Sequence, residues 1–281
     1  MKKSTKILLI GGILLVLVGG LMMFITGGIL GGQKVKALIE NGDLSVELGD
    51  LGLVGYHFDS DENTQNEEQF AMGKQQIGTG ADIKNLDIDF GAGEFEIVES
   101  EDEYIYLEIN HSIPFEYGID KEQTLYVKPK GKVISSATGE ITLYLPQDMV
   151  FDEVDFDLGA GEMVASKLET KELEISVGAG AVTLKNLKCD VADMEVGAGE
   201  MMVNNGDVKI LSLDLAMGEA RLNLAGTEED YDYDLSCGAG EIKVGSMYSG
   251  GVAFDKDTDF GREKEINVQC AMGTVTVDFA E

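Results

Sequence analysis

The stretch Asn85-Leu86-Asp87-Ile88-Asp89-Phe90-Gly91-Ala92-Gly93-Glu94 joins a run of alternating apolar residues to a glycine-rich corner. The corner returns at residues 159–162, 178–181, 197–200, 216–219, 238–241 and 271–274. Its third residues Gly161, Gly180, Gly199 and Gly218 are 19 residues apart, and the later gaps are longer. Repetition at a fixed interval is the signature of a repeat architecture.

Apolar residues alternate with polar ones on both sides of the corner, as in Leu86, Ile88 and Phe90 before it and Phe95 and Ile97 after it. Period-2 alternation predicts half-buried strands. The alternation slips by one residue at the corner, so both strands face one core only if the chain bends there. The pattern predicts an all-β fold, a β-solenoid of about 19-residue coils over residues 83–281. A β-sandwich is the alternative, but sandwich strands do not share one corner sequence at fixed spacing.

The third corner residue is glycine in every copy, whereas the first becomes Ala216 and Ala271. The invariant positions are Gly93, Gly161, Gly180, Gly199, Gly218, Gly240 and Gly273. We expect these structural corners to need a positive φ or to have no space for a Cβ atom, and the first position to be only a tight fit. The middle residue, Ala or Met, is expected to point inward.

The N-terminus has the pattern of a membrane anchor. Lys2, Lys3 and Lys6 precede residues 7–30, which contain no charged residue and are long enough to span a bilayer. The excess of positive charge before this segment predicts a cytoplasmic N-terminus and an extracytoplasmic location for residues 33–281. A cleaved signal peptide is the alternative. The predicted parts are the N-terminus and transmembrane helix (1–32), an acidic juxtamembrane stalk or loop (33–82) and the solenoid (83–281).

The charge balance restricts the partners. The chain has 52 acidic and 21 basic residues, a formal charge of −31. Such a charge repels nucleic-acid phosphates, so we expect no nucleic-acid partner. It favours solubility, and it also allows binding of cations or cationic peptides.

Glutamates recur at one position of the repeat, as Glu94, Glu162, Glu200, Glu219 and Glu241. Stacked coils would place them about 4.8 Å apart in a column, where like charges repel unless they are screened or bridged. A bridging Ca²⁺ is attractive on these grounds, and Glu200/Glu219 and Glu219/Glu241 are the best predicted pairs. Ala181 and Thr274 interrupt the column, and solvated carboxylates are the simpler interpretation.

Neither the cysteines nor the histidines form a catalytic pattern. Cys237 and Cys270 occupy inward positions of neighbouring coils, where buried thiols are favoured over a disulfide, and Cys189 is expected to be unpaired or partly exposed. No Ser or Cys can be matched to a His, since His57 and His111 both lie outside the regular repeats. The strands also offer no evident outward row of aromatic rings for sugars. We therefore predict a protein that is not an enzyme and needs no cofactor.

Two irregular regions flank the regular coils. Residues 104–109 and 123–127 predict further strands that either join the stack or cover its N-terminal end. The C-terminal segment 268–281 predicts an uncapped last coil, whose edge would be a template for strand addition. We expect the inserted loop 248–264 to cover that edge, or the edge to dock another strand.

The repeat unit Asn85–Glu94, the segment Ile141–Pro146 and the elements Glu172–Ile175 and Leu184–Leu187 resemble the bacterial putative-adhesin β-strand-repeat domain family, a domain of unknown function. The resemblance covers residues 83–281. It implies an extracytoplasmic β-helix of the kind found in envelope proteins, often within cell-envelope stress regulons of Gram-positive bacteria. It implies no substrate and no active residues.

These observations predict a non-catalytic binding or scaffold module of the bacterial cell envelope, anchored through residues 7–30. The partner would be an envelope protein, a glycan or a cationic peptide, and the ectodomain is expected to be monomeric. The alternative is an acidic sensor or decoy for cationic envelope-active peptides in a stress response. Salt distinguishes the two, because only binding of a cationic peptide should be lost at high ionic strength.

Overall fold

The computed structural model describes residues 36–40, 43–47, 53–57, 73–111, 114–130, 139–246, 248–250 and 252–280. No helix within these residues is long and apolar enough to cross a bilayer. The predicted transmembrane segment 7–30 and the basic residues before it lie outside the described residues. The chain divides into two compact units, residues 1–68 and residues 69–281.

The first unit contains a small antiparallel sheet within the region predicted as an acidic juxtamembrane stalk or loop, residues 33–82. Strand β2 (Asp43–Glu47) pairs with both β1 (Lys36–Glu40) and β3 (Leu53–His57). His57 is the last residue of β3. The second unit starts before the predicted boundary at residue 83, because β4 (Gly73–Thr79) pairs with a strand of that unit.

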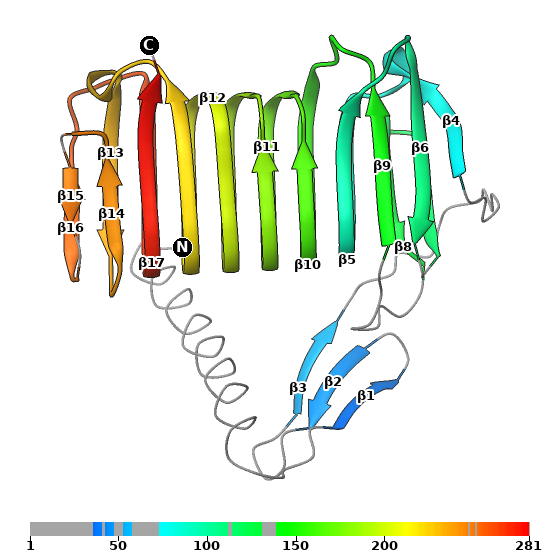
Figure 1. The fold of residues 1–281 in the computed structure, drawn as a ribbon, viewed down its shortest axis with the longest axis horizontal. Helices are drawn as coiled ribbons and strands as arrows, with labels where there is room; N and C mark the ends of the chain where they lie inside the picture. Colours follow the sequence, from blue (N-terminus) through cyan, green and yellow to red (C-terminus); the bar gives the residue numbers. More distant parts are fainter. Residues whose placement is uncertain are drawn as a thin grey trace. The chain divides into compact units, whose positions relative to one another are not determined.

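The second unit is a stack of two-stranded coils (Figure 1). The coils in the middle of the stack are β5 (Asn85–Glu99), β10 (Phe151–Ala165), β11 (Leu168–Leu184) and β12 (Leu187–Ala225), of which β12 is long enough to form two. They pair in parallel and in register, so that Gly93, Gly161, Gly180 and Gly199 adjoin in turn. The structure confirms the all-β prediction and the 19-residue coil.

The core is continuous from coil to coil because equivalent residues stack. Ile88, Phe156, Ile175 and Met194 are register partners in one column, and each is at most 2% exposed. In β5 the buried residues change phase at the corner, from Phe90 to Phe95. The predicted slip therefore bends each strand so that both of its halves face the same core.

The C-terminal strand does not lie at the end of the stack. Strand β17 (Lys264–Ala280) pairs in parallel with the second coil of β12 on one side. On its other side it pairs with β13 (Tyr231–Cys237) and β14 (Glu241–Val244), which precede it in the sequence. Figure 1 shows β17, in red, between β12 and the orange strands. The prediction of an uncapped C-terminal edge is wrong, because the last coil is inserted between two earlier ones.

The outer coil at this end is covered by the inserted loop. Strand β15 (Tyr248–Gly250) pairs with β14, and β16 (Phe254–Asp257) pairs with β13, both antiparallel. The Ala253 amide also donates a hydrogen bond to the Gly238 carbonyl oxygen. The loop thus covers an edge, as expected, but the edge belongs to β13 and β14.

The N-terminal end of the stack has the same arrangement. Strands β8 (Thr124–Pro129) and β9 (Gly139–Leu145) form a coil parallel to β5, although they follow β5 in the sequence. Strand β7 (Phe115–Ile119) pairs antiparallel with β8, β6 (Tyr104–His111) pairs antiparallel with β9, and β4 lies beyond β6. The sequence predicted that the strands of this region either join the stack or cover its end. Both occur, since β8 and β9 join the stack while β6 and β7 cover it.

Matching short turns lead into β5 and β13. The turns η2 (Gly80–Asp82) and η3 (Glu228–Asp230) are 3-10 helices. In each, a threonine donates its hydroxyl and its amide to an aspartate three residues later, Thr79 to Asp82 and Thr227 to Asp230. These contacts satisfy amides that the short helix leaves without a backbone partner.

Candidate binding surfaces

The corner glycines set how closely the coils approach. A Cβ atom on Gly199 would overlap the carbonyl oxygen of Gly180, and one on Gly218 would overlap that of Gly199. At the first corner position the space is larger, since a Cβ on Gly197 would lie 2.7 Å from the Gly178 carbonyl oxygen. Gly93 and Gly218 in addition adopt φ values of +120° and +136°. The two expected reasons for an invariant glycine, a positive φ and a lack of space for a Cβ atom, therefore both occur along this column.

The middle residue of the corner does not point inward. Ala160, Ala179 and Ala239 are exposed, and the Met272 side chain is 36% exposed. The backbone of the corner is packed against the corners of neighbouring coils, which leaves the core to the strands on either side.

The register places the glutamate column in a different order from the one expected. Glu94 has Glu140 on one side and Glu162 on the other, so three glutamates are consecutive at the N-terminal end. The predicted pair Glu219/Glu241 is wrong, because Thr274 of the inserted strand β17 lies between them.

The column does not assemble a set of metal ligands. Glu200 and Glu219 occupy equivalent positions of the two β12 coils, and Glu219 pairs with Arg221 at 2.7 Å. Among the residues described by the structure, no group of three or more His, Cys, Asp or Glu side chains could hold a metal ion.

A broader acidic surface lies on the outer side of the first strand of each coil, and we call it the acidic face. One of its columns runs through Asp87, Asp155, Glu174 and Asp193, and a second runs through Asp89, Asp157, Ser176, Glu195 and Asp214. Lys128 bounds this face at the N-terminal end, with its ammonium 2.7 Å from the Asp87 carboxylate.

Stacking in register changes the chemistry of these carboxylates. Burial and the neighbouring charge of Asp157 together raise the pKa of Asp89 to about 6. Burial and the charge of Asp87 raise the pKa of Asp155 to about 6, and burial and the charge of Glu195 do the same for Asp214. Protonated and charged forms therefore coexist on this face in mild acid.

Elsewhere the coils neutralise their charges in pairs. Lys188 contacts Glu169 of the preceding coil at 2.6 Å, and Lys209 contacts Asp190 at 2.6 Å. These pairs lie at the opposite turn of the coil from the glycine corner. The acidic face differs from this turn, where lysines of one coil contact carboxylates of the preceding coil.

All three cysteines are buried thiols. Cys237 and Cys270 are register partners in β13 and β17, and burial raises the pKa of Cys270 to about 12. Of the two alternatives expected for Cys189, the structure shows the first, because it is a free thiol that is only 3% exposed. Its thiol donates to the Val191 carbonyl oxygen at 2.8 Å. Its pKa is raised to about 12 by burial, so the thiol is unreactive at neutral pH.

His111 is part of the N-terminal packing. Its Nε2 lies 2.7 Å from the Ala92 carbonyl oxygen, and its ring contacts Phe90 and Phe115 edge-on. The side chain is 8% exposed, which places it beside the first corner and out of reach of a substrate.

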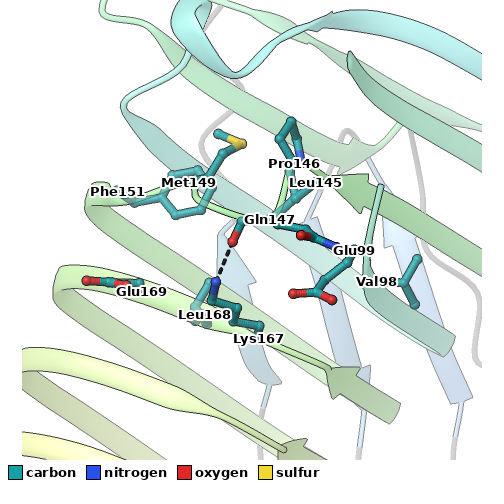
Figure 2. Close-up of a pocket in the computed structure, with 10 residues that line it drawn as sticks. All are labelled: Val98, Glu99, Leu145, Pro146, Gln147, Met149, Phe151, Lys167, Leu168 and Glu169. Atoms are coloured by element: carbon teal, nitrogen blue, oxygen red, sulfur yellow. Dashed lines mark hydrogen bonds between the residues drawn. The ribbon is translucent and has the colours of Figure 1, made fainter. Parts of the chain in front are cut away.

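A small cavity lies where β9 turns into β10, and Figure 2 shows its lining. Lys167 donates to the Gln147 carbonyl oxygen across it, and the carboxylates of Glu99 and Glu169 lie at its sides. Its volume is about 20 Å³, which is room for one water molecule. A wider, open groove of about 510 Å³ lies nearby, lined in part by Thr79, Tyr104, Pro146 and Val150.

Two aromatic rings adjoin on the outer side of the N-terminal end, a group that the repeat pattern did not indicate. Tyr106 of β6 and Tyr144 of β9 are register partners, both half-buried, and their rings are perpendicular with centroids 6.5 Å apart. The Lys74 ammonium lies over both rings. Sequence analysis missed this group because the three residues come from separate strands that adjoin only when β6 reverses direction.

The comparisons with known proteins identify the fold family. Residues 83–247 match the Toastrack DUF4097 family model. No curated protein matches the chain.

Three solved bacterial structures are similar to this chain at low identity. A putative cell adhesion protein from Clostridium sporogenes ATCC 15579 is 17% identical, with 74% of this chain and 98% of that chain covered at a TM-score of 0.41. A putative adhesin from Bacteroides fragilis NCTC 9343 is 12% identical, with 73% and 94% covered at a TM-score of 0.36. A putative lipid binding protein from Parabacteroides distasonis ATCC 8503 is 13% identical, with 74% and 95% covered at a TM-score of 0.30.

The family model spans more than half of the chain and ends just after the outer coil formed by β13 and β14. It includes six of the seven glycine corners, all except residues 271–274, and the acidic face. By this match, the chain belongs to the Toastrack DUF4097 family.

Proposed function

We propose that the protein is a non-catalytic binding or scaffold module of the bacterial cell envelope. Residues 7–30 anchor it in the membrane, with the N-terminus in the cytoplasm and residues 33–281 outside. Its partner is a component of the envelope and not a nucleic acid.

The observation that carries this proposal is the stack itself. Coils paired in register along their whole length give a rigid surface on which equivalent side chains repeat at about 4.8 Å. The end coils are covered by antiparallel strands, which favours a monomeric module whose faces, and not its edges, meet other molecules. The small cavity has room for one water only, so a ligand as large as a peptide or a glycan would bind on these outer faces or in the open groove of about 510 Å³.

Topology is tested by protease treatment of intact cells that produce the full chain with a tag at each end. The proposal expects loss of the C-terminal tag and protection of the N-terminal tag. Crosslinking in the same cells, followed by mass spectrometry, then identifies envelope partners. Protection of both tags until the cells are lysed would overturn the extracytoplasmic placement.

The acidic face favours a second candidate function, that of a sensor or decoy for cationic envelope-active peptides. Its carboxylates repeat along two adjacent columns, and a peptide with regularly spaced Lys or Arg residues could pair with several at once. Repulsion within the columns would be relieved by such a peptide, which adds to the attraction.

This second function is tested with a lysine-rich peptide and the full chain in nonionic detergent. Binding should weaken steeply between low salt and about 0.5 M salt, since exposed charges are then screened. The Asp155→Asn/Asp157→Asn variant should bind more weakly than the wild type. Glu101→Gln, which removes an exposed carboxylate from the bend after β5, should bind as the wild type does. Equal binding by both variants would remove the acidic face from this role.

A further inference from the structure

The rings of Tyr106 and Tyr144 stand at a right angle on the outer surface of the N-terminal end. We call the space between them the aromatic corner, which is distinct from the glycine corners. Because the two rings meet at 90°, a group placed in the aromatic corner faces the π-surface of one ring and lies close to the other. The Lys74 ammonium occupies this place, 3.6 Å from the centroid of Tyr144 and 4.6 Å from that of Tyr106. Both distances are within the range of a cation–π interaction.

Carboxylates hold the two rings in place. The Tyr106 hydroxyl donates to Asp102 at 2.8 Å, and the Tyr144 hydroxyl donates to Glu108 at 3.1 Å. Glu108 is also the register partner of Lys74. The aromatic corner therefore combines two oriented aromatic faces with two nearby negative charges, and this is the arrangement that selects an ammonium group over a neutral or anionic one.

Lys74 is a weakly held occupant. It is exposed and lies on β4, the outermost strand of this end, whose described partner strand is β6 on one side only. A primary ammonium in such a place gains little, because it is strongly hydrated and its long side chain loses rotamer freedom. A methylated ammonium is less hydrated and gains more from the same two rings.

We propose that Tyr106 and Tyr144 form a binding site for ligands that carry a quaternary ammonium group, and that Lys74 is a tethered competitor that keeps the site filled until such a ligand displaces it. The site rests on the proposed role of the protein as a binding module and names a ligand chemistry for it. It lies on β9, the second strand of the N-terminal coil, and on the covering strand β6, and it is separate from the acidic face.

The probe is tetramethylammonium chloride, titrated into the full chain in nonionic detergent with NaCl at equal ionic strength as the reference. The chain has 9 tyrosines and no tryptophan, so ¹³C-labelled tyrosine gives a small set of ring signals. The signal of Tyr144 is assigned by its loss in Tyr144→Phe. We expect saturable shifts of Tyr106 and Tyr144, with an affinity at least about fivefold higher in Lys74→Ala, because the competitor is gone.

Matched variants separate the site from nonspecific effects. Lys74→Arg keeps a cation in the aromatic corner and should retain the weak affinity of the wild type, whereas Lys243→Ala removes an exposed lysine at the far end of the stack and should change nothing. In a Lys74→Ala background, Tyr144→Leu should abolish the shift of Tyr106, while Tyr144→Phe, which keeps the ring, should preserve it.

Two results would overturn the proposal. One is the lack of any saturable tyrosine shift in Lys74→Ala, and the other is unchanged affinity after Tyr144→Leu in that background. Neither result bears on peptide binding by the acidic face. That binding is tested separately with Asp155→Asn/Asp157→Asn, which leaves both tyrosines in place. A failure of this site is therefore distinguishable from a failure of the broader binding role.

Discussion

Gly199 shows how the lack of one methyl group fixes the distance between coils. Its Cα faces the carbonyl oxygen of Gly180 so closely that any side chain would push the two coils apart. Gly197, two residues earlier, has more space, and the equivalent residues Ala216 and Ala271 are accommodated. The invariance of one corner position and the variability of the other have a steric cause.

We predict that Gly199→Val destabilises the protein severely, by roughly 3 kcal/mol or more, and that Gly197→Ala costs about 1 kcal/mol. The difference follows from overlap with backbone in the first case and a tight but adjustable contact in the second. Urea denaturation of the full chain in nonionic detergent, followed by circular dichroism, gives both values. Equal costs would show that the neighbouring coil can shift to admit a side chain at either position.

The roles of single residues were predicted well for residues that recur in the repeat and poorly for residues that occur only once. The corner glycines recur seven times in the sequence, so their special role is visible without a structure. Tyr106, Tyr144 and Lys74 have no repeated counterparts, and their meeting depends on the direction and register of β6. A pattern that occurs once gives no internal comparison from which to infer a role.

At the scale of a strand, the parallel in-register pairing that builds the core also places like charges side by side. Asp89, Asp155 and Asp214 have pKa values of about 6 in the folded chain, above the value of about 4 expected for an unfolded aspartate. Between these values the folded state binds more protons than the unfolded state. Stability therefore falls as pH rises from about 4 to about 6 and is lower at neutral pH than in mild acid.

We predict a higher melting temperature at pH 5 than at pH 7.5. Asp155→Asn should raise the melting temperature at pH 7.5 and flatten its pH dependence, because it removes a charge that is unfavourable in the folded state. Calorimetry across this pH range, with Glu101→Gln as the matched control, is the measurement. A melting temperature that rises steadily from pH 5 to pH 7.5 would contradict the prediction.

The covering strands β15 and β16 protect the edge of the last coil in space. Deleting residues 248–257 would expose the backbone amides and carbonyls of β13 and β14, which then pair with the same edge of another molecule. We predict concentration-dependent oligomers by sedimentation velocity.

An exposed apolar side chain of the same loop, that of Val252, provides the control for this deletion. Val252 is 80% exposed, so Val252→Ser removes apolar surface without uncovering an edge, and it should leave the protein monomeric. A deletion variant that remains monomeric and equally stable would show that β15 and β16 do not protect the edge.

At the scale of the whole molecule, the sequence predicted the kind of fold and not the order of its coils. Local alternation and the corner repeat determine that residues 85–99 and 264–280 are bent strands with one buried face. Neither pattern determines which coil lies next to which, because every coil presents the same corner and similar apolar columns. Strands β5 and β17 each lie between an outer coil and the middle of the stack, and the antiparallel strands that cover those outer coils have no repeat.

The middle of the stack should tolerate a change of length that its ends do not. Removing residues 187–205, one 19-residue coil, joins Asn186 to Gly206, and Asn186 is equivalent to Asn205. We predict that this variant folds with a single cooperative transition at a lower temperature, since each coil contributes its own interface.

Truncation after Glu263 is the contrasting variant. It removes the only described strand that connects β12 to β13 and β14, so the outer coil loses its parallel partner. We predict loss of the cooperative transition in thermal circular dichroism. Equal behaviour of the two variants would show that the outer coil can re-pair directly with β12.

The inserted position of β17 also has a consequence for the order of biosynthesis. The second coil of β12 and the coil of β13 and β14 are both synthesised before the strand that separates them. A nascent chain can stack its middle coils as they emerge, but it must leave a vacant slot beside β12 until β17 is made. Only a chain that includes β17 closes the slot, and a chain that terminates before β17 presents two open edges to quality-control proteases.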